Sequence, residues 1–155
     1  MNAGLIERLS SADLDERNEA IVEATEASGA EVADALAGLV TSPDVGTPAR
    51  TAAAQALARM PDPEGALRLR SLLEHEESGF RVLAASGLEF HPDSTTVMAL
   101  LSVLADPVNK VRNVAERSLL AMTCAFTEES HRQIADLLDH PVPLTRSPAA
   151  RLVGA

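Results

Sequence analysis

The chain has 155 residues, a length that suits one ordinary hydrophobic core or one short repeat array. Its hydrophobic fraction is 46%, yet its aromatic fraction is only 2%, so the apolar mass comes from Ala, Leu and Val, which favours helices over strands. A net charge of −10 argues against a nucleic-acid or anionic-lipid surface, and no apolar run reaches the roughly 18 residues of a membrane span. We therefore expect an all-α protein that binds neither nucleic acid nor membrane.

Helix signals follow one another along the whole chain with only short connections. Asp or Thr followed by Pro, as at Asp62-Pro63, Asp106-Pro107 and Thr47-Pro48, is typical of a helix N-terminus. Acidic residues stand at other expected helix starts, as in Glu128-Glu129, where they favour the positive end of the helix dipole. The expected helices cover residues 3–9, 12–28, 30–41, 47–60, 63–75, 78–90, 93–105, 107–124, 128–139 and 142–153.

Five arginines mark an internal repeat with separations of 33, 31, 31 and 34 residues. An alanine stands three residues after each arginine, and an apolar residue stands seven after it. Offsets of three and seven lie on one helix face, which predicts a buried stripe on the second helix of each repeat. The register comprises Arg17, Arg50, Arg81, Arg112 and Arg146; Ala20, Ala53, Ala84, Ala115 and Ala149; and Ala24, Leu57, Leu88, Leu119 and Val153.

An apolar pair precedes each of the last four arginines, so that each repeat reads as a first helix, a short turn and a second helix. The pairs are Leu39-Val40, Leu72-Leu73, Val103-Leu104 and Leu137-Leu138, and the turn after Leu39-Val40 has two extra residues. We expect repeats at 1–28, 29–61, 62–91, 92–126 and 127–155 within one domain, 1–155. One helical hairpin cannot bury its apolar face alone, so neighbouring hairpins are expected to stack.

The segment Leu104-Ala-Asp-Pro-Val-Asn-Lys-Val-Arg-Asn-Val-Ala-Glu-Arg-Ser-Leu119 resembles the repeat motif of HEAT-repeat proteins, in particular the short bacterial repeats of phycobilin-lyase-type HEAT proteins. The resemblance implies a right-handed α-solenoid of about five antiparallel hairpins. In the family, a turn aspartate and the arginine of the second helix form a ladder between repeats. The turn position six before each arginine reads Ser11, Asp44, His75, Asp106 and His140 here, so we expect an incomplete ladder in which His or backbone carbonyls are alternative partners.

Residues 1–40 concentrate the negative charge, with nine acidic side chains against Arg8 and Arg17. Such a field attracts a basic protein, although an acidic helix face is also an ordinary solubilising surface. We mark four residues of the expected helix 12–28 as a candidate binding face: Glu16, Glu19, Glu23 and Glu26.

No pattern in the sequence predicts a catalytic, cofactor-binding or metal-ligating residue. His75 and His140 occupy equivalent turns two repeats apart, too far to share one metal ion. Cys124 has apolar neighbours, which predicts a small buried residue and not a nucleophile. As the single cysteine it also excludes an internal disulfide and fits a reducing compartment, and no signal-peptide pattern is seen at the N-terminus, so we expect a cytoplasmic protein.

The five arginines allow two interpretations. They can line an anion-binding groove, or each can pack beside its turn and bond to turn groups; recurrence in every repeat favours the second. For the whole chain we expect a non-enzymatic scaffold or adaptor that binds a basic protein partner. The alternative is an accessory subunit of a cofactor-attachment enzyme of the bilin-lyase kind, or of another modifying enzyme, which the resemblance implies.

Overall fold

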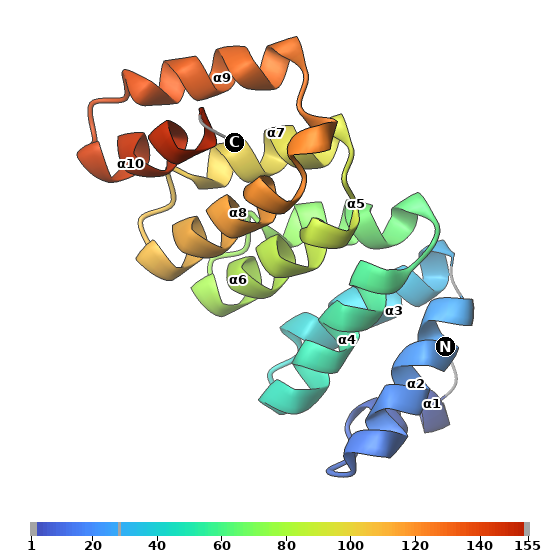
Figure 1. Cartoon of the computed structure of the whole chain (residues 1–155). Helices are drawn as coiled ribbons and strands as arrows, with labels where there is room; N and C mark the ends of the chain where they lie inside the picture. Colours follow the sequence, from blue (N-terminus) through green and yellow to red (C-terminus); the bar gives the residue numbers. More distant parts are fainter. Residues whose placement is uncertain (1–2, 28, 154–155) are drawn as a thin grey trace. The chain divides into compact units, whose positions relative to one another are not determined.

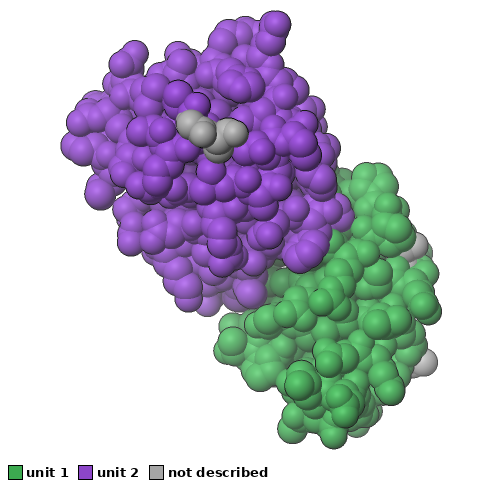
Figure 2. Space-filling model, viewed as in Figure 1, with its two compact units in different colours: residues 1–72 green, residues 73–155 purple. Residues whose placement is uncertain are grey.

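The computed structural model describes residues 3–27 and 29–153, and within these ranges it contains ten α-helices, two short 3-10 turns and no strand. The expected all-α fold class is confirmed. The chain divides into two compact units, residues 1–72 and 73–155 (Figure 2). This division falls within the third expected repeat, between its two helices. The expectation of one domain therefore stays a prediction.

Unit 1 contains α1 to α5, in which hairpin partners lie side by side and equivalent helices of successive hairpins also touch (Figure 1). Helix α1 packs on α2 and α3 packs on α4, while α2 also contacts α4 and α3 contacts α5. Stacking of like helices on like is the arrangement of a helical repeat array. The helices are α1 (Ala3–Leu9), α2 (Leu14–Ala27), α3 (Ala30–Thr41), α4 (Thr47–Arg59) and α5 (Pro63–Leu72).

Unit 2 repeats this arrangement with α6 to α10. Helix α8 contacts α6, α7 and α10, and α9 contacts α7 and α10. The helices are α6 (Ser78–Gly87), α7 (Ser94–Val103), α8 (Asn109–Ala121), α9 (Glu128–Leu138) and α10 (Pro143–Leu152), with 3-10 turns η1 (Leu88–Phe90) and η2 (Thr123–Ala125). All ten α-helices begin and end within three residues of the expected ranges.

The repeat register forms the core of both units. The alanine three residues after each arginine is fully buried in all five repeats, with an exposed fraction of 0%. The residue seven after the arginine is also fully buried in the first four repeats, but in the fifth Val153 is 64% exposed. Alanine at the close-packed position lets the second helices approach one another, and leucine fills the space between them.

Two close contacts attach α5 to the rest of unit 1. The Asp62 side chain, just before α5, accepts a hydrogen bond of 2.6 Å from the backbone N–H of Gly29, whose φ of 92° favours glycine. Gly65 lies against the carboxyl end of α4, where a Cβ built on it would come within 2.2 Å of the Leu57 carbonyl oxygen. Gly65 therefore permits an approach between helices that no other residue allows.

The expectation of a buried Cys124 is wrong. Helix α8 ends at Ala121, three residues before the expected end, and the chain continues as the 3-10 turn η2. The tighter turn changes which side chains face inward, so Met122 is 1% exposed while Cys124 is exposed. The expectation assumed a regular helix that continues to residue 124.

Candidate functional site

The register arginines bind the backbone of their own turns. In four repeats the Nη1 group donates to the carbonyl oxygen of the residue six positions earlier. The pairs are Arg17 to Ser11 at 2.5 Å, Arg81 to His75 at 2.8 Å, Arg112 to Asp106 at 2.6 Å and Arg146 to His140 at 3.0 Å. These carbonyls lie beyond the ends of the first helices, where helical partners are absent.

In the second repeat the arginine also bonds to a carbonyl oxygen of its own turn, but the turn is longer. Arg50 donates from Nη2 to the Ser42 carbonyl at 2.8 Å and from Nε to the same oxygen at 3.2 Å. Ser42 lies eight positions before the arginine, which matches the two extra residues in this turn. Asp44, at the nominal position of the family aspartate, is exposed.

Different side chains accept the same backbone hydrogen bond in the other four turns. Each residue six before the arginine uses its side chain to accept from the N–H two positions later. The bonds are Asp13 N–H to Ser11 Oγ at 3.1 Å, Glu77 to His75 Nδ1 at 3.0 Å, Val108 to Asp106 Oδ1 at 2.8 Å and Val142 to His140 Nδ1 at 3.2 Å. Histidine and serine thus replace the turn function of aspartate without its charge.

Asp106 adds a link between repeats. Its carboxylate accepts from Arg81 Nε at 2.7 Å and from Arg81 Nη2 at 3.1 Å, across a sequence separation of 25 residues. The two side chains are only 11% and 8% exposed. Burial raises the pKa of the Asp106 carboxyl, but hydrogen bonds from Arg81 and from the Val108 N–H outweigh burial and leave that pKa below its ordinary value.

A second link between repeats was not predicted. Glu116 in α8, only 7% exposed, pairs with Arg151 in α10 through both carboxylate oxygens; the contact from Nη2 to Oε2 measures 2.6 Å. The two residues lie 35 positions apart, and neither belongs to the repeated register. The hydrogen bond to Glu116 raises the pKa of Arg151 further. Spacing close to one repeat length is the only sequence signal for this pair.

The four glutamates of the candidate binding face all lie on α2 with exposed side chains. The structure separates them into two pairs. Glu23 forms an ion pair with Arg8 of α1, and Glu16 accepts a hydrogen bond from Ser11. Glu26 has no basic partner among the residues that the structure describes, and Glu19 attracts Arg8 without forming an ion pair with it, so both side chains remain exposed to solvent.

Apolar side chains also lie on the exposed part of α2. Val22 is 52% exposed, and Ala20 and Ala24 on the opposite surface are buried. Leu14, seven residues before the buried Ile21, lies at the edge of the exposed surface at the start of the helix and is 61% exposed. At about 100° per residue, Val22 lies between Asp15, Glu19 and Glu26 on the helix surface. We call Leu14, Asp15, Glu19, Val22 and Glu26 the acidic face.

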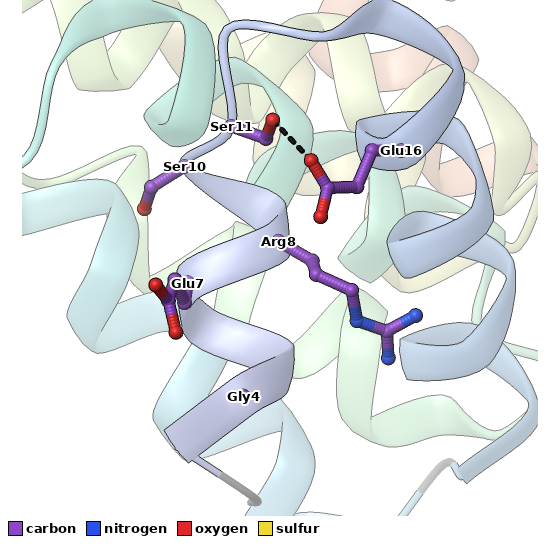
Figure 3. Close-up of a pocket in the computed structure, with 6 residues that line it drawn as sticks. All are labelled: Gly4, Glu7, Arg8, Ser10, Ser11 and Glu16. Atoms are coloured by element: carbon purple, nitrogen blue, oxygen red, sulfur yellow. Dashed lines mark hydrogen bonds between the residues drawn. The ribbon is translucent and has the colours of Figure 1, made fainter.

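A shallow pocket of about 670 Å³ lies beside this helix, between α1 and the start of α2 (Figure 3). Figure 3 shows Ser11 bonded to Glu16 at one side and Arg8 extending from α1 between the two helices. The lining residues are Gly4, Glu7, Arg8, Ser10, Ser11 and Glu16, all exposed or half-buried. A wall of exposed polar side chains suits water and ions better than an apolar cofactor.

Residues suited to metal or nucleophilic chemistry are dispersed. Among residues 3–27 and 29–153, no group of three or more His, Cys, Asp or Glu side chains is placed to hold a metal ion. His75 lies edge-on against Phe80 at 4.7 Å between ring centroids, and His131 lies edge-on against Phe126 at 5.9 Å. Over the same described ranges, the helices are too short or too polar for any of them to cross a lipid bilayer.

The fold and the register define an all-α repeat protein of the solenoid class. Residues 47–120 match the family model of HEAT repeats, which confirms the resemblance inferred from the motif. No protein of curated function matches the chain in sequence.

Solved structures of similar fold include a chain from the complex of CpcE and CpcF of phycocyanin lyase from Nostoc sp. PCC7120. It shares 24% identity with a TM-score of 0.54, and the alignment covers 96% of this chain and 62% of that one. The present chain therefore spans less than two thirds of its length. An engineered protein is similar at 22% identity with a TM-score of 0.53, covering 99% of this chain and 80% of that one. These likenesses support the repeat fold.

Proposed function

We propose that this chain is a non-enzymatic scaffold that binds a protein with a basic surface through the acidic face of α2. The observation that carries the proposal is the combination of solvent-facing Glu19 and Glu26 with the exposed apolar side chains of Leu14 and Val22. Apolar side chains at the centre of a contact supply affinity, and surrounding carboxylates supply orientation and a fast association rate.

The side chains that hold the turns together differ from the carboxylates that are exposed on α2, and this difference supports the assignment. Arginines of the repeat register are occupied with their own turns, and Arg8 neutralises Glu23. Glu19 and Glu26 form no ion pair in these contacts and are exposed, so their carboxylates are accessible to a partner. Repeat arrays commonly present such extended surfaces for protein recognition.

The experiment is affinity capture from the native host with two charge-reversed baits. Glu19→Lys combined with Glu26→Lys changes the acidic face, and Glu128→Lys with Glu129→Lys makes the same change of charge on α9. We expect the wild-type and α9 baits to retain one basic protein that elutes with salt, and the α2 bait to lose it. Equal retention by all three baits contradicts the proposal.

An accessory role in bilin attachment is the second candidate, favoured by the fold likeness to a chain of the phycocyanin lyase complex. Such a role requires a pocket that encloses a tetrapyrrole, whereas the pocket beside α1 is polar and exposed. Absorbance spectra of the purified chain titrated with a bilin separate the candidates. The scaffold proposal predicts an unchanged bilin spectrum, and a shifted or intensified band would favour the accessory role.

A further inference from the structure

The second helices of unit 2 share one exposed surface. Helices α6, α8 and α10 lie side by side, with α8 in contact with both neighbours (Figure 1). On each of them, the positions two before the register arginine and one, five and nine after it lie opposite the buried positions three and seven. We call these positions the outward stripe. On α8 the stripe comprises Lys110, Asn113, Arg117 and Ala121, all exposed.

The charge of the outward stripe changes sign along the chain. On α2 the stripe includes Asp15 and Glu26 and no basic residue, whereas on α8 it includes Lys110 and Arg117 and no acidic residue. The stripe of α6 is uncharged, and that of α10 includes Arg151. Together α6, α8 and α10 contain six basic residues and one acidic residue, although the net charge of the chain is −10. Unit 2 therefore presents a basic surface on an acidic protein.

Lys110 and Arg117 are the two cations of this surface that the fold does not pair. Glu116, which is 7% exposed, accepts from Arg151 through both carboxylate oxygens and so neutralises it. Arg117 donates from Nη2 to Ser86 Oγ of α6 over 3.4 Å, a long hydrogen bond. In residues 3–27 and 29–153, neither Lys110 nor Arg117 forms an ion pair.

The place of Lys110 gives the fold no benefit. It lies in the first turn of α8, at the positive end of the helix dipole, where a cation lowers helix stability. A carboxylate from outside the chain would offset this repulsion, and the same carboxylate donor can reach Arg117 further along the exposed stripe.

Exposed apolar side chains flank Arg117. Leu120, one turn later on α8, is 40% exposed, and Phe90 of η1, which packs on α8, is 63% exposed. Ser86, the partner of Arg117, precedes Phe90 by four residues. Glu89 of η1 is half-buried and lies at the eighth position after its register arginine, beside the stripe. Burial of Phe90 and Leu120 against a partner would supply affinity, while the cations would supply orientation.

We propose that this surface binds an acidic segment of a partner protein that carries carboxylates and a large apolar side chain. We call Phe90, Lys110, Asn113, Arg117 and Leu120 the basic face. Lys110 and Arg117 are seven residues apart on one helix, which corresponds to about 10 Å. Carboxylates three residues apart in an extended segment have about the same spacing, so a segment that lies along α8 can pair with both cations.

Charge and composition favour an acidic polypeptide over the other occupants of a basic surface. Single-stranded nucleic acid is bound by several aromatic stacking platforms along a basic groove, and the basic face offers Phe90 alone. The acidic face of α2 selects the opposite charge, so this inference is independent of the function proposed for α2.

Fluorescence anisotropy with the full chain tests the proposal. The probe is a labelled peptide of three Glu-Glu-Leu-Ser repeats, and its matched controls replace every Glu by Lys or every Leu by Ser. We expect the acidic peptide to bind, the Lys peptide not to bind, and the Ser peptide to bind more weakly. Raising the salt concentration from about 20 mM to 300 mM should weaken the binding of the acidic peptide.

Arg117→Glu and Lys110→Glu should each weaken binding of the acidic peptide by about fivefold or more. Arg132→Glu is the matched control, because Arg132 is an exposed arginine of α9, away from the basic face, and it should bind like the wild type. Circular dichroism checks that all three variants keep the helical fold, as is expected for substitutions of exposed side chains.

A second measurement needs no substitution. Lys110 is the single lysine of the chain, so mild acetylation modifies it and the N-terminal amine, and mass spectrometry follows both. Saturating acidic peptide should slow acetylation of Lys110 by about fivefold relative to the N-terminal amine, which serves as the internal reference.

The proposal is overturned if the wild type fails to bind the acidic peptide at concentrations up to about 1 mM. Equal binding by Arg117→Glu and Arg132→Glu, or unchanged acetylation of Lys110, would overturn it as well. Tighter binding of a labelled oligothymidylate than of the peptide would assign the basic face to nucleic acid instead. Sedimentation that becomes faster with the concentration of the wild type, but not of Arg117→Glu, would assign it to a second copy of this chain.

Discussion

Gly65 shows how much one absent Cβ contributes to the packing of unit 1. A Cβ there would come within 2.2 Å of the Leu57 carbonyl oxygen and 3.0 Å of the Met60 Cβ, and backbone cannot move aside as a flexible side chain can. We expect Gly65→Ala to lower the free energy of unfolding by about 1–3 kcal/mol, despite the better helix propensity of alanine. Chemical denaturation followed by circular dichroism measures the change.

Gly38, in α3, is the control for this substitution. No atom lies within 4 Å of a Cβ built on it, so Gly38→Ala should raise the free energy of unfolding by about 0.5–1 kcal/mol. Opposite signs at the two glycines are the expected result. Stabilisation by Gly65→Ala would show that α4 and α5 are not in this close contact.

Asp106 makes the folding stability of unit 2 depend on pH. Because its folded pKa lies below the ordinary value of about 3.9, its contribution is present above that value and is lost as pH falls through the folded pKa. Asp106→Asn should therefore cost roughly 1–3 kcal/mol at about pH 7 and less at about pH 3, because pH 3 lies below the unfolded pKa of the carboxyl. Urea denaturation of both proteins at the two pH values measures this difference.

Asp136→Asn serves as a comparison, since Asp136 is an exposed carboxylate and should change stability by less than about 0.5 kcal/mol at either pH. An Asp106→Asn cost that is equal at neutral and at acidic pH would mean that the charge of Asp106 does not stabilise the fold.

At the scale of the helices, four of the five turns combine an arginine with an acceptor side chain. Of these, only the Asp106 turn also links two repeats through the described contacts of these positions. Asp106 pairs with the arginine of the preceding repeat, and by the same register an acid at position 140 would face Arg112. We expect His140→Asp to raise the free energy of unfolding by roughly 0.5–1.5 kcal/mol by forming a second link.

His140→Asn separates the turn hydrogen bond from the charge. Asparagine can still accept from the Val142 N–H, but it gives Arg112 no carboxylate, so stability should change little. Thermal denaturation of both variants measures the effect. Equal melting temperatures for the two would show that the link requires more than the register position.

The spacing of residues in the sequence was sufficient to predict the helices and the stripe that they bury. An arginine, the alanine three residues later and the apolar residue seven residues later all lie on one helix face. The sequence analysis also named backbone carbonyls as alternative partners of the arginines, and in the structure the arginines donate to backbone carbonyls. The pairing of Glu116 with Arg151 and the close contact at Gly65 depend on how the hairpins stack, so neither has a local sequence signal. Cys124 was misplaced because the ends of helices depend on packing as well as propensity.

At the scale of the whole molecule, the residues that provide most of the negative charge differ from the residues of the repeat register that stabilise the fold. The net charge is −10, of which residues 1–40 contribute −7, and the outward carboxylates of α2 lie outside the repeated register. A surface that the fold does not require can vary to suit a partner while the scaffold remains constant. The basic partner is therefore expected to recognise α2 by charge and by the exposed Leu14 and Val22.

The salt dependence of that affinity tests the scaffold proposal most directly. Titration calorimetry of the captured partner with the full chain, at about 50 mM and 500 mM salt, should show weaker binding at the higher concentration, because the Debye length falls to a few Å. The variant with Glu19→Lys and Glu26→Lys should bind at least tenfold more weakly at low salt, and the α9 control should bind like the wild type. Affinities that are equal for the three proteins and insensitive to salt would contradict the account.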